Sequence, residues 1–142
     1  MVDRYVTELI ATTNDATNPD RWIDASFLDV FRGFVEFSLR RLRDAEGAAR
    51  ARRQLALADP EIAAEEEKGS IYMMDRVFEL LWTRRDEIGR PNPEAGINYV
   101  IDQTIAMTRA RAALPGIRIV TDTDETFIDA TVESARAFLQ IN

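Results

Sequence analysis

The residue types that carry most protein chemistry are scarce in this chain. It contains no histidine and no cysteine, so zinc, haem and non-haem iron sites of the familiar kinds cannot form, nor can catalysis by histidine or cysteine. The densest carboxylates are residues 65–67, all glutamate, and the group Asp122, Asp124 and Glu125. Successive helical residues point apart, so we interpret the first group as a solvated face and the second as a helix start, not as an acid-base pair. We therefore predict a protein that is not an enzyme and has no metal site and no cofactor.

Aromatic and methionine side chains offer binding as the other route to a function. They concentrate in two predicted helices, around residues 27–37 and 72–78, with further candidates near residue 103. Ordinary core packing is one interpretation, and an apolar pocket between helices, with a few polar groups to orient a ligand, is the other. The residues predicted to bind a ligand on the second interpretation are Phe27, Phe31, Phe34, Tyr72, Met73, Val77, Tyr99, Gln103 and Met107.

Charge and glycine distribution argue against nucleotide, nucleic-acid and membrane partners. The formal net charge is -7, which repels phosphate backbones, and the six glycines are scattered singly instead of forming a phosphate-binding loop. We interpret the arginine-rich run 40–53 as a solvated helical face, with an anion contact as the alternative. No stretch of about 18 apolar residues and no signal-peptide pattern occurs. We expect a cytoplasmic protein that binds neither DNA nor a membrane.

The helices that must position these residues are marked by their starts. A chain of 142 residues is long enough for one domain, here residues 1–142. Asn or Asp followed by Pro and an acid occurs at residues 18–20, 59–61 and 92–94. This order suits a helix N-terminus, because the first residue caps, proline fits the first helical position and the acid meets the positive end of the helix dipole. A fourth start is expected between residues 121 and 125.

Apolar spacing between these starts predicts an all-α fold. The helix over 20–43 is apolar around more than half of its circumference, so we expect it at the centre, with Gly33 marking the close approach of another backbone. The extended-looking stretch 114–120 is too short to build a sheet. The sequence predicts a helical bundle of about six helices. The expected helices are 2–13, 20–43, 45–57, 60–88, 93–114 and 124–140.

The last two predicted helices, 93–114 and 124–140, carry more apolar surface than one chain of this size needs. Such an excess indicates a subunit interface, and we predict a homodimer in which these helices meet their copies. An arginine at Thr131 or Ala135 is then expected to yield monomers. The residues predicted to form the interface are Ile97, Ile101, Thr104, Thr108, Phe127, Thr131, Ser134, Ala135 and Phe138.

Three segments follow one another in a familiar order. Residues 2–11 form a short amphipathic helix without a cap, Leu-Leu-Trp-Thr-Arg-Arg-Asp-Glu-Ile at 80–88 is followed by Pro-Asn-Pro-Glu-Ala at 91–95, and a final helix covers 123–139. In this order they resemble the C-terminal ligand-binding and dimerisation domain of TetR-family transcriptional regulators. The first segment is similar to the helix that joins the family's DNA-binding head to its body, and the others to its last body helices.

The resemblance implies an all-helical domain with an effector pocket among the earlier helices and a four-helix dimer interface built from the last two helices of each subunit. The helix-turn-helix head of the family is absent, so residues 1–17 are interpreted as a remnant of the connecting helix. We expect no direct DNA binding by this chain. Two explanations stay open, namely a fragment of a longer regulator and a naturally headless relative.

Two functional hypotheses follow from these patterns. The first is an effector-sensing and dimerisation domain of a TetR-like transcriptional regulator, which binds a small apolar or amphipathic molecule. The alternative is a headless helical interaction module that forms homodimers or heterodimers without binding ligand or DNA, in which the aromatic residues are only core. An unrecognised helical enzyme is a formal third hypothesis.

Overall fold

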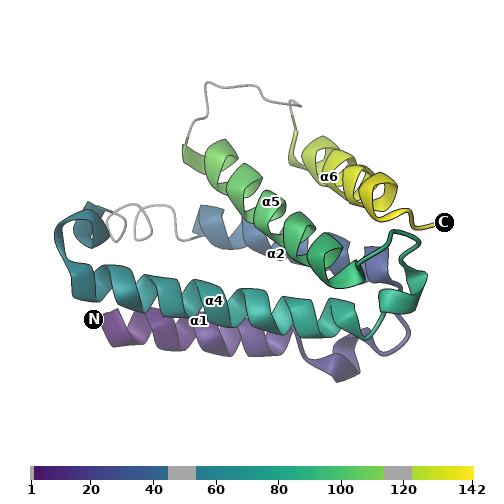
Figure 1. The fold of residues 1–142 in the computed structure, drawn as a ribbon. Coiled ribbons are helices and arrows are strands. Elements are labelled where there is room, and N and C mark those ends of the chain that lie inside the picture. The colour runs from purple at the N-terminus through teal and green to yellow at the C-terminus, as the bar shows by residue number, and fades with distance from the viewer. Residues whose placement is uncertain (1, 45–53, 114–122) are drawn as a thin grey trace.

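The computed structural model describes residues 2–44, 54–113 and 123–142, and in these ranges the chain is an all-α helical bundle without strands (Figure 1). This confirms the predicted fold class. The predicted helix over 45–57 is described only from residue 54, and the stretch 114–120 lies outside the described residues. None of the helices in the described ranges is long and apolar enough to span a membrane. The elements are α1 (Val2–Ala16), the 3-10 turn η1 (Pro19–Trp22), α2 (Phe27–Asp44), a short helical segment at 54–58, α4 (Pro60–Trp82), the 3-10 turn η2 (Arg85–Glu87), α5 (Pro93–Ala113) and α6 (Asp124–Leu139).

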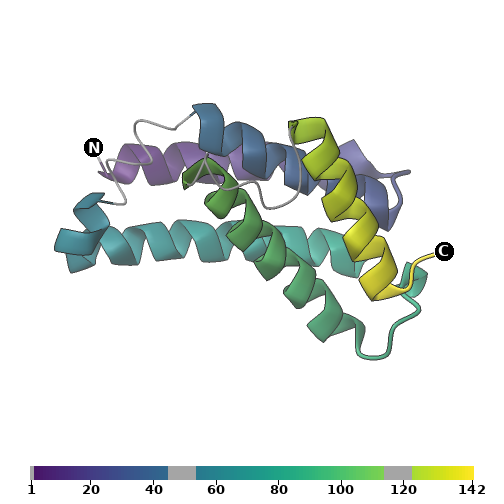
Figure 2. The same ribbon diagram turned by 90° about the horizontal axis from the view of Figure 1, so that it is seen from above.

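The helices form two layers: α1 and α4 make a base, and α5 and α6 lie across it. α1 and α4 lie side by side and run in the same direction (Figure 1). α5 and α6 cross this base obliquely, as the view from above shows (Figure 2). α2 contacts α4, α5 and α6. The predicted central position of the helix after residue 20 is therefore confirmed for its α2 part.

The core lies where α2, α4, α5 and α6 meet. Phe27 and Phe31 of α2, Leu81 of α4, Ile101 of α5 and Leu139 of α6 are at most 2% exposed. Burial of side chains of this size contributes roughly 1.5–3 kcal/mol each to the free energy of unfolding, measured against an exposed side chain. The apolar periodicity of the sequence arises from this shared core.

The predicted starts of α4 and α6 carry the expected side-chain caps. The Asp59 carboxylate accepts a hydrogen bond from the Glu61 amide at 2.9 Å, and α4 begins at the proline between them. The Thr123 hydroxyl accepts one from the Thr126 amide at 3.2 Å at the start of α6. α5 begins at Pro93, also as predicted.

The predicted helix start at residue 20 is wrong. The Asn18 side chain does cap, accepting a hydrogen bond from the Asp20 amide at 3.0 Å, but the chain it caps is only the 3-10 turn η1. α2 begins instead after Ser26, whose hydroxyl accepts from the Asp29 amide at 3.2 Å while the Asp29 carboxylate accepts from the Ser26 amide at 3.3 Å. This reciprocal pair is a capping box, which satisfies two backbone donors at once.

The end of α4 also differs from the prediction, because α4 stops at Trp82 and the 3-10 turn η2 replaces the expected helix up to residue 88. The chain then meets the end of α6. The Gly89 and Arg90 amides donate to the Leu139 carbonyl at 3.2 and 3.1 Å. Gln140 ends α6 in a left-handed conformation, with φ of 56°. The end of α6 is thereby held against the loop that precedes α5.

Candidate ligand-binding site

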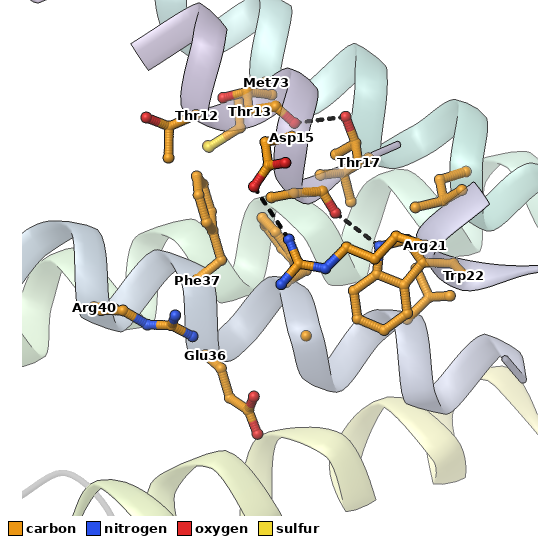
Figure 3. A pocket seen from close by; sticks show the side chains of 16 residues that line it. Thr12, Thr13, Asp15, Thr17, Arg21, Trp22, Glu36, Phe37, Arg40 and Met73 are labelled. Carbon is orange, nitrogen blue, oxygen red and sulfur yellow. Dashed lines mark hydrogen bonds and ion pairs between the residues drawn. The ribbon is translucent and has the colours of Figure 1, made fainter. Parts of the chain in front are cut away.

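A cavity of about 220 Å³ lies between α1, η1, α2 and α4 (Figure 3). An apolar cavity of about 150 Å³ is large enough to hold benzene. The space between these helices therefore has room for a molecule with one ring and a short substituent.

The inner wall of the cavity is apolar. Val30 and Phe34 of α2, four residues apart, face Met73, Val77 and Leu80 of α4, which are spaced by four and three. Residues at these spacings share one face of a helix. All five are buried, with at most 7% exposure. The wall thus results from two amphipathic faces that meet without filling the space between them.

Trp22 supplies a further wall from η1. Its indole Nε1 donates a hydrogen bond to the Ala16 carbonyl at 2.7 Å, which joins η1 to the end of α1. The ring lies against Gly33, where a Cβ atom would come within 2.4 Å of the indole Cη2. The close approach predicted at Gly33 therefore exists, but a side chain makes it, so the prediction of a neighbouring backbone is wrong.

Arg84, which follows α4, holds this wall in place. Its Nε donates to the Ala25 carbonyl at 2.8 Å, and its Nη2 donates to the Trp22 carbonyl. Its Nη1 donates to the Leu80 carbonyl at 3.0 Å and to the Thr83 hydroxyl at 2.9 Å. One guanidinium therefore joins the segment after η1 to the last turn of α4.

The rim of the cavity is charged and balanced. The Arg21 Nη1 and Asp15 Oδ2 atoms lie 3.3 Å apart, and Figure 3 shows these two side chains pointing toward each other. Glu36 and Arg40 of α2 complete the rim. With two acids and two arginines, the rim has no net formal charge. The site thus combines an apolar wall with polar, solvent-facing edges, as ligand pockets commonly do.

The residues predicted to form one ligand pocket are divided between different places. Three of them, Phe34, Met73 and Val77, line the cavity described above. Another three line a second cavity, which α2 borders together with α5 and α6; these are Phe31, Gln103 and Met107. The other three line neither of these cavities: Phe27 is fully buried in the core, Tyr72 donates a hydrogen bond to the Asn14 side chain, and Tyr99 is 52% exposed with its ring against Phe138.

The second cavity, of about 200 Å³, lies between α2, α5 and α6. It is lined by uncharged residues, which are Phe31, Val100, Gln103, Thr104, Met107, Phe127, Ala130, Thr131, Ser134 and Ala135. The side chains at its outer edge are mostly small and exposed. We call the uncharged surface made by Tyr99, Gln103, Ala106, Ala130, Ser134 and Ala137 the α5–α6 face.

Most of the predicted interface residues lie in the core of the single chain. Seven of the nine are buried within the chain itself, which leaves them little surface to offer to a second subunit. The hydrophobic periodicity identified the side of each helix that faces the core, and that side belongs to one chain. Ser134 is exposed and Phe138 is half-buried. The seven buried residues are Ile97, Ile101, Thr104, Thr108, Phe127, Thr131 and Ala135.

Sequence reasoning missed the residues that η1 and α1 bring to the cavity. Trp22, Arg21 and Asp15 belong to it, and none was among the predicted ligand-binding residues. A signal was present, because Trp22 is the large aromatic residue of a polar segment and Gly33 interrupts the next helix. The two together indicate an aromatic ring lying on a glycine.

The acidic groups do not assemble into a metal site in the described part of the chain, where no three metal-binding side chains gather. Glu65 pairs with Lys68 at 3.4 Å on the surface of α4, and Asp124 accepts a hydrogen bond from Arg111 at 3.1 Å. Asp122 lies outside the described residues.

Comparisons of the chain with protein-family models, with curated proteins and with solved structures found no match.

Proposed function

We propose that this chain is the effector-sensing and dimerisation part of a TetR-like transcriptional regulator, and that it binds a small apolar or amphipathic molecule between α1, α2 and α4. The observation that carries the proposal is the cavity of about 220 Å³ with its apolar wall and charged rim. The resemblance of the segment order to that family supplies the regulatory context.

The position of α1 supports a sensing role. Residues 12, 13 and 15–17, at the end of α1 and just after it, form part of the cavity wall, and α1 packs along α4. A molecule in the cavity therefore contacts α1 directly, and any differential affinity for two positions of α1 shifts their populations. In a regulator with a DNA-binding head before α1, such a shift changes the placement of the head.

The α5–α6 face supports the dimerisation part of the proposal. It is uncharged, it includes Tyr99, which is 52% exposed, and the second cavity opens between its two helices. Small exposed residues such as Ala106 and Ala137 let another helix approach closely. A second copy that packs its own α5 and α6 here covers this surface on both subunits, as two-fold dimers do.

Ligand binding can be tested by thermal denaturation with a collection of apolar and amphipathic small molecules. A binder present at a hundred times its Kd stabilises the folded protein by about 2.7 kcal/mol. Val77→Phe places a larger ring in the cavity and is expected to abolish this stabilisation. Ile71→Phe, on the exposed side of the same helix, is the matched control and is expected to retain it. Absence of any compound that stabilises the natural protein but not Val77→Phe contradicts ligand sensing.

Dimerisation requires different variants from those the sequence suggested. Arginine at Thr131 or Ala135 would disrupt the core, because both side chains are buried. Gln103→Arg, on the α5–α6 face, is expected to yield folded monomers, since it places like charges at the interface of both subunits. Asn98→Arg makes the same amide-to-arginine change on another side of α5 and should leave a dimer. Light scattering distinguishes the two, and a natural protein that is monomeric at high concentration refutes this part of the proposal.

The interaction-module alternative is favoured by one observation, namely that the α5–α6 face exists independently of the α1–α2–α4 cavity. On this alternative the chain dimerises, but no compound distinguishes it from Val77→Phe. The two experiments together therefore separate the two functions.

A further inference from the structure

The cavity between α2, α5 and α6 opens on the α5–α6 face and has room for one aromatic ring. Its volume is about 200 Å³, and an apolar cavity of about 150 Å³ is large enough to hold benzene. Phe31 and Phe127 supply aromatic surface to its wall, while Gln103 and Ser134 are exposed side chains that can form hydrogen bonds. The cavity therefore suits a ring that carries one polar group, such as a phenol.

Tyr99 presents a phenol on the same face. The residue is 52% exposed, and its ring lies against that of Phe138, with the two centroids 4.7 Å apart. The Arg90 guanidinium also packs on the Phe138 ring, 4.0 Å from its centroid. These contacts hold Tyr99 in place on the free subunit, so little side-chain freedom is lost when a partner binds. Tyr99 does not line the cavity of its own chain.

Two-fold symmetry brings the Tyr99 ring and the cavity together. Along α5, Tyr99 lies one turn before Gln103, and Met107, which lines the cavity, lies one turn after it. When the two-fold axis runs across α5 at Gln103, the two copies of α5 are antiparallel. Each residue one turn before Gln103 then lies opposite the residue one turn after it. The partner's Tyr99 is thereby placed at Met107, beside the cavity.

The charge of this face favours a second copy of the chain as the partner. Close to a two-fold axis a charged side chain lies near its own copy, so like charges weaken a symmetric contact. The α5–α6 face lacks this penalty because its side chains are uncharged, although 30% of the residues in the chain are charged and the net charge is -7. Ala106 and Ala137 are small and exposed, which lets the second copy approach closely.

We propose that each subunit of the dimer inserts its Tyr99 ring into the α2–α5–α6 cavity of the other subunit, so that the partner copy fills each cavity. This inference rests on the proposed dimerisation and names the side chain that anchors it. Removal of an anchoring aromatic side chain weakens an interface by about 30-fold or more. A symmetric dimer contains two such rings, so loss of both weakens it by about 1000-fold.

Two complementary variants test the insertion by analytical ultracentrifugation. Tyr99→Ala removes the ring and should weaken the homodimer by about 1000-fold. Ala130→Phe fills the cavity, which Ala130 lines, and should also weaken the homodimer because the partner's Tyr99 no longer fits. In an equimolar mixture, Tyr99 of the Ala130→Phe subunit can enter the open cavity of the Tyr99→Ala subunit, and the filled cavity meets no ring. The mixture should therefore form a heterodimer that is tighter than either homodimer, and a tag on one variant identifies it.

Control variants separate the insertion from general effects on folding. Tyr99→Phe keeps the ring and should keep the dimer. Tyr72→Ala makes the same truncation on α4, where Tyr72 contacts Asn14, and should also leave a dimer. Circular dichroism checks that each variant is folded. Ser134→Phe, at the exposed mouth of the cavity, takes the place of Ala130→Phe if that variant does not fold, with the same expected results.

The outcomes separate this inference from the proposed function. If Gln103→Arg dissociates the dimer but Tyr99→Ala or Ala130→Phe dimerises as tightly as the natural protein, the insertion is wrong and the α5–α6 face remains the interface. If both variants are monomeric and their mixture forms no heterodimer, Tyr99 supports the dimer without entering the cavity, which also overturns the inference. A natural protein that is monomeric at high concentration refutes the proposed dimerisation itself.

Discussion

Replacing Arg84 with methionine tests how strongly the Trp22 wall of the cavity is held to α4. The guanidinium makes two contacts across the fold, to the Trp22 and Ala25 carbonyls, and two within the end of α4. A hydrogen bond to a charged group contributes about 1.5–3 kcal/mol when it is buried. Arg84 is only half-buried, so water replaces part of what is lost. We expect the free energy of unfolding to fall by about 2–4 kcal/mol, most of it from the two contacts across the fold.

Urea denaturation at equilibrium measures this loss, and the Tm should fall by about 6–12 °C for a chain of this length. The emission of Trp22 should shift to longer wavelength as its segment detaches. Arg85→Met is the matched control, because Arg85 is exposed and makes one hydrogen bond, to the Trp82 carbonyl at 3.0 Å, so a loss below about 1 kcal/mol is expected. Equal losses in the two variants, or an unchanged Trp22 emission in Arg84→Met, would refute the reasoning.

Three further outcomes are expected. Gly33→Ala places a Cβ within 2.4 Å of the Trp22 ring and should cost about 1–3 kcal/mol of stability while exposing the indole, as unfolding and fluorescence measurements can check. Gln140→Gly should stabilise the protein by about 1 kcal/mol in urea denaturation. Gln140 has a left-handed conformation with φ of 56°, which is unfavourable for residues other than glycine. A hydrogen bond from Arg136 lowers the pKa of the Glu133 carboxyl, so an NMR titration should place its midpoint below the ordinary value and Arg136→Gln should raise it.

Helix starts could be predicted from the sequence where the local signal was sufficient. Asp59 and Thr123 cap the helices that follow them, because their side chains reach the backbone amides two or three residues later in any context. The signal at residues 18–20 is equally strong, yet only a 3-10 turn follows. The carbonyls of Trp22 and Ala25, which a continuing helix would use internally, accept hydrogen bonds from Arg84, about 60 residues away in the sequence. No local pattern contains that contact.

The cavity residues were only partly predictable for a related reason. Periodicity identified the apolar sides of α2 and α4 and therefore found Phe34, Met73 and Val77. It did not reveal that Phe31, three residues before Phe34, faces a different pair of helices. Which neighbour a side chain meets depends on how the helices cross, and α2 is apolar around so much of its circumference that several arrangements satisfy it.

The position of α2 links the two proposed activities. Phe34 lines the cavity beside α1, Phe31 lines the cavity beneath the α5–α6 face, and the centroids of their rings lie 6.3 Å apart. A ligand that displaces Phe34 toward α5 and α6 presses on the neighbouring Phe31 ring, which lies beneath the surface proposed to bind a second subunit. Linkage then makes the coupling reciprocal: if dimerisation changes the affinity for the ligand by some factor, the ligand changes the affinity between the subunits by the same factor.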